Sequence, residues 1–322
     1  MVITVIISVL LGLAWLWSLF AIRYFAPVPI SVRTPLFLLV AGAPWIIVPT
    51  LGWTFALVVT GIVVVPVIVS WIIVKPRNDL DWAPDQERIP AVEFHGDIAT
   101  IHNLRRATYR SRTDFDVEWY SHSFDLSQLR TAEYVVEPFG KLSAMAHTFV
   151  TFGFANGDYL PISIEIRRER PEQFNPVAGI YRQYEIMYVM GDERDLIGLR
   201  SNIRKDDVYI YPIRASRARV RRMLEAMLRR ADRLNREPEF YNTLVNNCAT
   251  NILAHLNELE GRRFPFDYRV VAPGWSDRYA YDHGLIDTDL PFEQAKPEFR
   301  INERSEFGDS DAREWSRQIR GL

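Results

Sequence analysis

The N-terminal part of the chain is almost free of charge, and this constrains the fold more than any other feature. Arg23 and Arg33 are the only charged residues between Met1 and Val74. The run Val2–Ile22 is uncharged and apolar, and its length matches the roughly 20 residues that cross a bilayer as a helix. It lacks the basic start and the small-residue cleavage site of a signal peptide. We therefore predict a membrane-spanning helix here.

The apolar sequence continues from Pro35 to Val74, about twice the length of one span. Helix-breaking residues interrupt it near its middle, at Pro44, Pro49 and Gly52. Two further helices, Leu36–Leu51 and Phe55–Val74, fit this length. We expect three transmembrane helices in residues 1–77, which would form a membrane anchor. The alternative is a buried pair of core helices, although a water-soluble fold rarely needs so long an apolar run before its first acidic residue.

The rest of the chain has the composition of a folded, water-soluble domain. The whole chain carries a net charge of −2, and because the first part contributes +2, the remainder carries −4. A net charge of this size does not indicate nucleic acid as a partner. The polar, proline-containing stretch 78–90 is typical of a linker, so we expect one domain over residues 91–322.

The sequence gives no indication of a cofactor. Glycine-rich nucleotide-binding patterns are absent, and the acidic stretch Asp192–Asp195 is interpreted as a loop with ion pairs rather than a metal site. We expect neither a cofactor nor a metal.

Segments rich in β-branched and aromatic residues predict antiparallel strands. The strongest signal is a hairpin, in which His147–Phe154 and Tyr159–Arg167 flank the turn pair Asn156-Gly157. Other strands are predicted at Asp97–Leu104, Phe115–Phe124, Thr131–Pro138, Tyr184–Met190 and Val208–Tyr211. Helices follow at Ser216–Asn235 and Cys248–Glu260. The predicted fold class is α+β.

The helix predicted at Ser216–Asn235 has one apolar stripe, with five arginines lying off it. The simplest interpretation of these arginines is a solvated face. The alternative is contact with anionic lipid headgroups.

The single cysteine, Cys248, stands at the start of a predicted helix. Free N–H groups and the helix dipole at this position favour the thiolate, which is the nucleophilic form. Asn246 or Asn247 would cap the helix, and the backbone N–H of the nucleophile would help to stabilise an oxyanion. We therefore interpret Cys248 as a nucleophile, although a lone cysteine is also common as an inert buried residue.

A cysteine nucleophile usually needs a base, and two of the six histidines are compared for this role. His255 lies two turns further along the same helix, about 10 Å away, which is too far for a hydrogen bond. His147 begins the best hairpin, and a strand histidine facing a helix cysteine is the geometry of papain-like thiol enzymes. The alternative is that His147 is structural.

A third group should orient the imidazole, and Glu165 and Ser163 on the return strand are the candidates. A two-residue turn would pair His147 with Ile166 and leave Glu165 on the opposite face. A one-residue bulge near Asn156-Gly157 would bring Glu165 alongside His147 instead.

Several blocks of sequence resemble a known family. They are HTFVTFGFANGDYLPISIEIRRE from His147, YRQYEIMYVMGDERDLIGLR from Tyr181 and PEFYNTLVNNCATNI from Pro238. With their flanks, from about Ile98 to Leu290, they are similar to the Lnb N-terminal periplasmic domain family, which is named for a bacterial lipoprotein N-acyltransferase.

The resemblance implies a circularly permuted papain-like fold of the NlpC type, with Cys248 as nucleophile and His147 as base. It also implies a domain in the periplasm, anchored to the bacterial inner membrane. The expected function is thiol acyl transfer from membrane phospholipid, with a lipoprotein as the possible acceptor. Two alternatives stay open: a periplasmic cysteine peptidase or amidase acting on peptidoglycan, and a non-catalytic binding module or scaffold.

Overall fold

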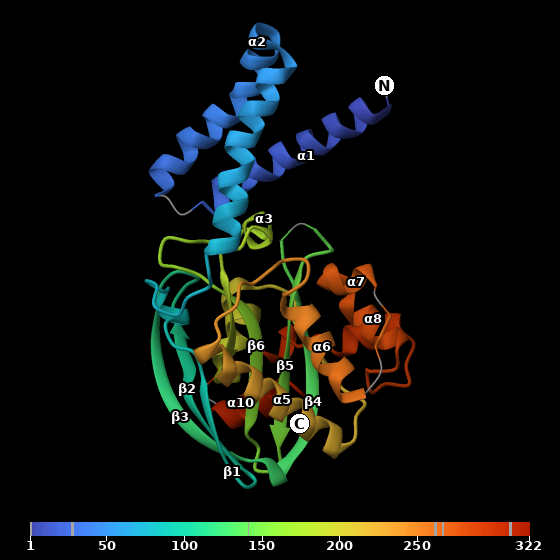
Figure 1. The fold of residues 1–322 in the computed structure, drawn as a ribbon. Coiled ribbons are helices and arrows are strands. Elements are labelled where there is room, and N and C mark those ends of the chain that lie inside the picture. The colour runs from blue at the N-terminus through green and yellow to red at the C-terminus, as the bar shows by residue number, and fades with distance from the viewer. Residues whose placement is uncertain (1, 27–28, 141, 261–262, 266, 309–310) are drawn as a thin grey trace. The chain divides into compact units, whose positions relative to one another are not determined.

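The computed structural model describes residues 2–26, 29–140, 142–260, 263–265, 267–308 and 311–322. It divides into two compact units (Figure 1). The first, which we call the helical unit, comprises Met1–Arg77, Gln173–Glu185 and Glu239–Asn242. The second, the sheet unit, comprises Asn78–Glu172, Ile186–Pro238 and Thr243–Leu322. The predicted α+β class is confirmed.

The apolar N-terminal sequence forms two helices where three were predicted. Helix α1 spans Val2–Tyr24 and α2 spans Ile30–Ile73. Pro44, Pro49 and Gly52 lie near the middle of α2 and do not end it. Each proline removes only one N–H donor, and the flanking turns keep their donors and hydrogen bonds. Among the helices of the described residues, none combines the length and apolar character needed to cross a membrane. The prediction of transmembrane helices is therefore wrong.

Part of this apolar sequence packs against a segment from much later in the chain. The Tyr181 ring lies among those of Trp17, Phe20 and Trp71, with centroid separations of 6.4, 5.8 and 6.3 Å. The Arg182 guanidinium lies 4.3 Å from the Trp71 ring and donates to the Trp71 carbonyl at 2.7 Å. Some of the apolar side chains of the N-terminal sequence therefore pack against other parts of the helical unit. Hydropathy along the sequence does not distinguish this packing from burial in lipid.

The sheet unit contains two sheets (Figure 1). Strands β1 (Ala91–His95), β2 (Ile98–Tyr109) and β3 (Phe115–Asp125) form an antiparallel sheet. The second sheet has the strand order β7-β6-β5-β4-β8. Its strands are β4 (Leu129–Pro138), β5 (Ala146–Phe154), β6 (Tyr159–Arg167), β7 (Glu185–Met190) and β8 (Tyr209–Pro212).

Helices α5 (Arg217–Arg236) and α6 (Cys248–Glu260) pack on one face of the five-stranded sheet. The predicted apolar stripe of α5 is buried. Of the five arginines off the stripe, Arg221 pairs with the carboxylates of Glu225 and Asp97. Arg236, one residue beyond the predicted helix, pairs with Asp232. This pairing is what a solvated face requires.

The opposite face of the five-stranded sheet carries a second core. Val135 of β4 and Phe149 of β5 pair directly and are fully buried there, with Trp315 and Ile319 from the C-terminal end of the chain. The helices that complete the described structure are α3 (Pro176–Ile180), α4 (Glu193–Leu196), α7 (Tyr268–Val271), α8 (Ser276–Asp282), α9 (Phe292–Glu298), α10 (Ala312–Gln318) and the short turns Pro84–Gln86, Leu126–Gln128, Leu199–Arg204, Pro273–Trp275 and Asn302–Arg304.

The acidic stretch Asp192–Asp195 forms the ion pairs that the sequence predicts, but it caps and begins helix α4, where a loop was predicted. Asp195 accepts two hydrogen bonds from Arg105, both at 2.8 Å, and both side chains are buried. Glu193 pairs with Arg320 at 2.7 Å. These carboxylates are buried with a cation each, which is the usual condition for burying a charge.

The β5–β6 hairpin closes through a three-residue connection, residues 155–157. Phe154 N–H donates to the Asp158 carbonyl at 2.9 Å, and Gly157 N–H donates to the Phe154 carbonyl at 3.0 Å. Gly157 has φ of +87°, the left-handed conformation of the bulge that ends such loops. The bulge adds one residue to the turn, and it therefore decides which residue of β6 faces each residue of β5.

This geometry predicts the effect of substituting Gly157. A Cβ at this position would have space, because the nearest atom would be Arg313 Cδ at 4.0 Å, so the penalty is conformational. We expect Gly157→Ala to lower the free energy of unfolding by about 1 kcal/mol, and Gly157→Asn to lower it less, because asparagine tolerates the left-handed region. Urea unfolding of the full chain measures both. Equal stability of the two variants would contradict the left-handed turn.

Candidate active site

Cys248 is the first residue of α6, as predicted, and Asn247 caps that helix. The Asn247 side-chain oxygen accepts from Thr250 N–H at 2.9 Å, while the Thr250 hydroxyl accepts from Asn247 N–H at 2.8 Å. This reciprocal pair is a capping box. The side-chain oxygen of Asn246 accepts from Asn251 at 2.8 Å. Both asparagines, predicted as cap or oxyanion residues, thus hold the helix start through their side-chain oxygens.

The Cys248 thiol is buried beside β5 and the first turn of its own helix. Burial raises the pKa of the thiol, and the nearby polar groups of Thr148 and the N–H groups of Ala249 and Cys248 offset this only in part. The Thr148 hydroxyl is itself buried without a well-formed hydrogen bond to the described residues. The position at a helix start predicts a thiolate, but the resting group is the neutral thiol, because partial charges on N–H groups do not replace full solvation.

His147 lies on β5 and forms a chain of hydrogen bonds with two residues of β6. Its Nε2 atom is 2.6 Å from the Ser163 hydroxyl, and that hydroxyl donates to Glu165 Oε1 at 2.7 Å. Because Ser163 has one hydroxyl hydrogen and gives it to Glu165, Ser163 must accept from His147. The proton of the neutral imidazole therefore resides on Nε2, which leaves the Nδ1 lone pair available as a base.

The register of the hairpin explains why Glu165 reaches this chain. Phe149 pairs with Ser163, so His147 lies opposite Glu165 two residues further along. Their side chains share one face, and Nε2 of His147 lies 3.8 Å from Oε1 of Glu165. This is the arrangement predicted for a one-residue bulge, rather than for a two-residue turn.

A buried arginine completes the cluster. Arg200 donates from Nε to Glu137 Oε2 at 2.6 Å and from Nη2 to Glu165 Oε1 at 3.0 Å. Arg204 Nη1 also donates to Glu137, at 3.3 Å. Both arginines lie on the π-helical turn Leu199–Arg204, and such turns are frequent at functional sites. No sequence signal singled out these two arginines, although Arg200 ends the second block of resemblance.

The electrostatics keep the imidazole neutral and the carboxylate ionised. Burial and the charge of Arg200 together lower the pKa of His147 to about 3, because Glu165 offsets them only in part. Burial alone would raise the pKa of Glu165, but Arg200 and His147 hold it well below its usual range. At neutral pH the resting site thus contains a thiol, a neutral imidazole and an ionised Glu165.

The structure brings some of the predicted site residues into contact and leaves others apart. His147, Ser163 and Glu165 are hydrogen-bonded to one another, whereas the Cys248 thiol contacts Thr148, the residue after His147. Because successive side chains of a strand point to opposite sides, thiol and imidazole adjoin the His147–Thr148 peptide from two sides. No hydrogen bond joins these two described side chains, as is common in ligand-free thiol enzymes.

Two neighbouring features fix the surroundings of the site. Gly274 packs so tightly on the loop before β5 that a Cβ there would lie 1.9 Å from the Ser143 carbonyl oxygen. Its N–H donates to the Ala144 carbonyl at 3.0 Å. His255 is buried on α6, with Nε2 3.0 Å from the Tyr188 hydroxyl. In the described part of the chain, His, Cys, Asp and Glu do not cluster in threes that could hold a metal.

The low pKa of His147 predicts acid lability. Its pKa is about 3 in the folded state, below the ordinary value of 6.5, so the unfolded state binds more protons between these values. Stability is therefore complete above the ordinary value and is lost as pH falls. His147 contributes a loss of about 2 kcal/mol between about pH 7 and pH 5.

The test compares wild type with His147→Gln, which does not titrate but retains an amide donor for Ser163. Urea unfolding at both pH values should show a drop smaller by about 2 kcal/mol in the variant. Equal drops would show that His147 does not have a depressed pKa.

One of three comparisons with known proteins gives a match. The family model described as the Lnb N-terminal periplasmic domain matches residues 115–274. That range contains His147, Ser163, Glu165, Arg200 and Cys248. The comparison with curated proteins and the comparison with solved structures gave no match. Residues 115–274 therefore form a domain of the Lnb N-terminal periplasmic domain family.

Proposed function

We propose that this protein is a periplasmic thiol acyltransferase that moves an acyl group from a membrane lipid through a thioester on Cys248. Membership of the Lnb N-terminal periplasmic domain family supports the compartment and the relationship to a lipoprotein-acylating system. One observation carries the chemistry. The chain Glu165–Ser163–His147 places the imidazole proton on Nε2 and leaves Nδ1 as the base, beside the peptide that the Cys248 thiol contacts.

In the first half-reaction the Cys248 S–H bond breaks and its proton moves to Nδ1 of His147. The sulfur forms a bond to the carbonyl carbon of a lipid ester, and the oxyanion is stabilised by the N–H groups of Cys248 and Ala249. The C–O bond then breaks, and the leaving alcohol takes the proton from Nδ1. The products are an acyl thioester and a deacylated lipid.

In the second half-reaction an amine attacks the thioester carbonyl, and Nδ1 of His147 accepts one amine proton. The C–S bond breaks, and the sulfur recovers the proton. Throughout both steps the Nε2–H stays hydrogen-bonded to Ser163, whose hydroxyl hydrogen stays directed at Glu165. The ionised carboxylate stabilises the imidazolium that forms, whereas Arg200 disfavours it.

The resting electrostatics indicate when the thiol loses its proton. A raised thiol pKa and a His147 pKa of about 3 make a free thiolate–imidazolium pair unfavourable. Proton transfer therefore accompanies formation of the C–S bond. It requires the start of α6 to move relative to β5, because the thiol and the imidazole lie on opposite sides of that strand in the resting structure. A bound ester makes the transfer favourable, because the developing charge moves from sulfur to the oxyanion.

The same dyad would serve a peptidase or amidase acting on peptidoglycan, and a non-catalytic module would retain it without turnover. The high thiol pKa predicts slow alkylation under each of these three hypotheses. The alkylation rate of the resting protein therefore does not discriminate between them. Transfer of acyl label from a lipid does.

The first prediction concerns the nucleophile. We expect the full chain, incubated with acyl-labelled phospholipid, to gain one acyl group by intact-mass analysis, and Cys248→Ala to gain none, because no thioester can form. Muropeptides serve as the competing substrate. Label retained by Cys248→Ala would contradict the assignment of Cys248 as the nucleophile. Cleavage of muropeptides without labelling by lipid would favour the peptidase or amidase hypothesis.

The second prediction concerns the relay. Ser163→Ala removes the acceptor of the Nε2 proton, so we expect acyl-enzyme formation to slow about 10–100-fold, with a changed pH profile. Ser163→Thr keeps a hydroxyl and should restore most of the rate. A Ser163→Ala enzyme with the wild-type rate and pH profile would show that Ser163 does not position the imidazole.

A further inference from the structure

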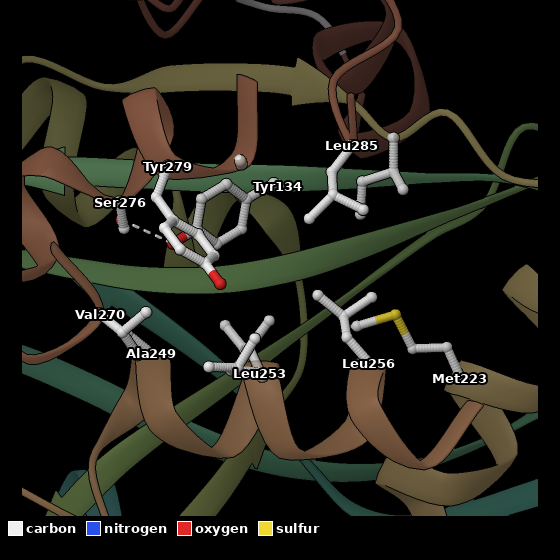
Figure 2. A pocket seen from close by; sticks show the side chains of 12 residues that line it. Tyr134, Met223, Ala249, Leu253, Leu256, Val270, Ser276, Tyr279 and Leu285 are labelled. Atoms are coloured by element: carbon white, nitrogen blue, oxygen red, sulfur yellow. Dashed lines mark hydrogen bonds between the residues drawn. The ribbon is translucent and has the colours of Figure 1, made fainter. Parts of the chain in front are cut away.

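An apolar pocket lies along α6 within the sheet unit (Figure 2). The space inside it and in its open mouth amounts to about 560 Å³, part of which is open solvent. One wall is the face of α6 formed by Ala249, Leu253 and Leu256. The opposite wall includes Tyr134 and Leu285.

The polar atoms that reach this pocket already have partners. The Tyr134 hydroxyl donates to Ser276 Oγ at 2.7 Å, and that hydroxyl donates to the Pro273 carbonyl at 2.6 Å. The Tyr279 hydroxyl donates to the Pro265 carbonyl at 3.0 Å. The pocket therefore offers an apolar surface, which suits a ligand without hydrogen-bonding groups along its length.

One end of the pocket lies close to the candidate nucleophile, although Cys248 itself does not line it. Ala249, at one end of it, is the residue after Cys248, and Thr148 lies against both the thiol and the Tyr134 hydroxyl. Leu256 and Leu285 lie at the other end, with the flexible side chain of Met223 (Figure 2). An apolar pocket that lies next to the thiol and extends away from it along α6 has the direction needed for the chain of an acyl thioester.

We propose that this pocket holds the hydrocarbon chain of the acyl group, with the carbonyl at Cys248 and the methyl end toward Leu256 and Leu285. The inference rests on the proposed acyl transfer. Seven residues separate Ala249 from Leu256, so the α6 wall is about 10 Å long. An extended chain advances roughly 1.25 Å per carbon, given a C–C bond of about 1.5 Å, so about eight carbons lie along the wall.

The geometry predicts an ordered effect of filling the pocket. Leu253 lies halfway along the wall, so Leu253→Trp should exclude octanoyl and dodecanoyl chains. Leu256 lies at the far end, so Leu256→Trp should exclude dodecanoyl more than octanoyl chains. Leu322→Trp is the matched control, because that C-terminal residue is 72% exposed.

The experiment measures acyl-enzyme formation by the full chain with butyryl, octanoyl and dodecanoyl p-nitrophenyl esters. We expect Leu253→Trp to lower the dodecanoyl-to-butyryl rate ratio by about tenfold or more, a typical effect of pocket contacts on selectivity. Ratios equal to those of Leu322→Trp in both pocket variants would overturn the proposal. If Leu253→Trp unfolds at a lower temperature than the wild type, the dodecanoyl-to-butyryl rate ratio of Leu256→Trp is the one that tests the proposal.

A binding measurement separates this inference from the proposed function. Calorimetry with dodecanoate uses Cys248→Ala protein, which cannot react, with and without Leu253→Trp. Binding that Leu253→Trp abolishes supports the pocket even if no ester acylates the wild type, in which case the acyltransferase proposal fails alone. The opposite outcome is acylation of the pocket variants with unchanged chain selectivity, together with no binding of dodecanoate to Cys248→Ala. That outcome would contradict the pocket proposal and leave the acyltransferase proposal standing.

Discussion

The candidate site depends on one buried guanidinium. Arg200 joins Glu137 on β4 to Glu165 on β6, at 2.6 and 3.0 Å. Without this charge, two carboxylates would be buried beside His147, and at least one of them would take up a proton. A protonated Glu165 would no longer fix the Ser163 hydroxyl hydrogen, and the tautomer of His147 would be undefined. The orientation of the base thus rests on a residue that contacts neither the imidazole nitrogen nor the thiol.

Local sequence signals predicted the framework of this site well. The Asn-Gly turn and the flanking alternation predicted β5 and β6 to within one residue, and the start of α6 at Cys248 was predicted because its cap is formed by the adjacent Asn247. The position of Glu165 depended on a single turn residue, and the sequence left two registers open. The left-handed Gly157 selected one of them.

The features that the sequence did not predict arise from tertiary packing. Arg200 meets Glu165 only because a π-helical turn distant in sequence reaches the end of the hairpin. The thiol is neutral because neighbouring elements bury it, and no pattern around Cys248 encodes that burial. The apolar N-terminal run likewise does not say what covers it, and the membrane spans inferred from it were wrong. Hydropathy and helix capping are properties of one segment, whereas the burial of a side chain depends on several segments that pack together.

The burial of Cys248 has a consequence for the lifetime of the protein. Oxidation to sulfenic acid and exchange with disulfides both start from the thiolate, and a raised pKa keeps that form scarce. The chain has no second cysteine that could protect or rescue the first through an internal disulfide. The periplasm is an oxidising compartment. In the proposed mechanism Cys248 ionises only against a bound ester, so it is spared oxidative damage between turnovers. That resistance comes from the position of the thiol in the fold rather than from a reducing partner.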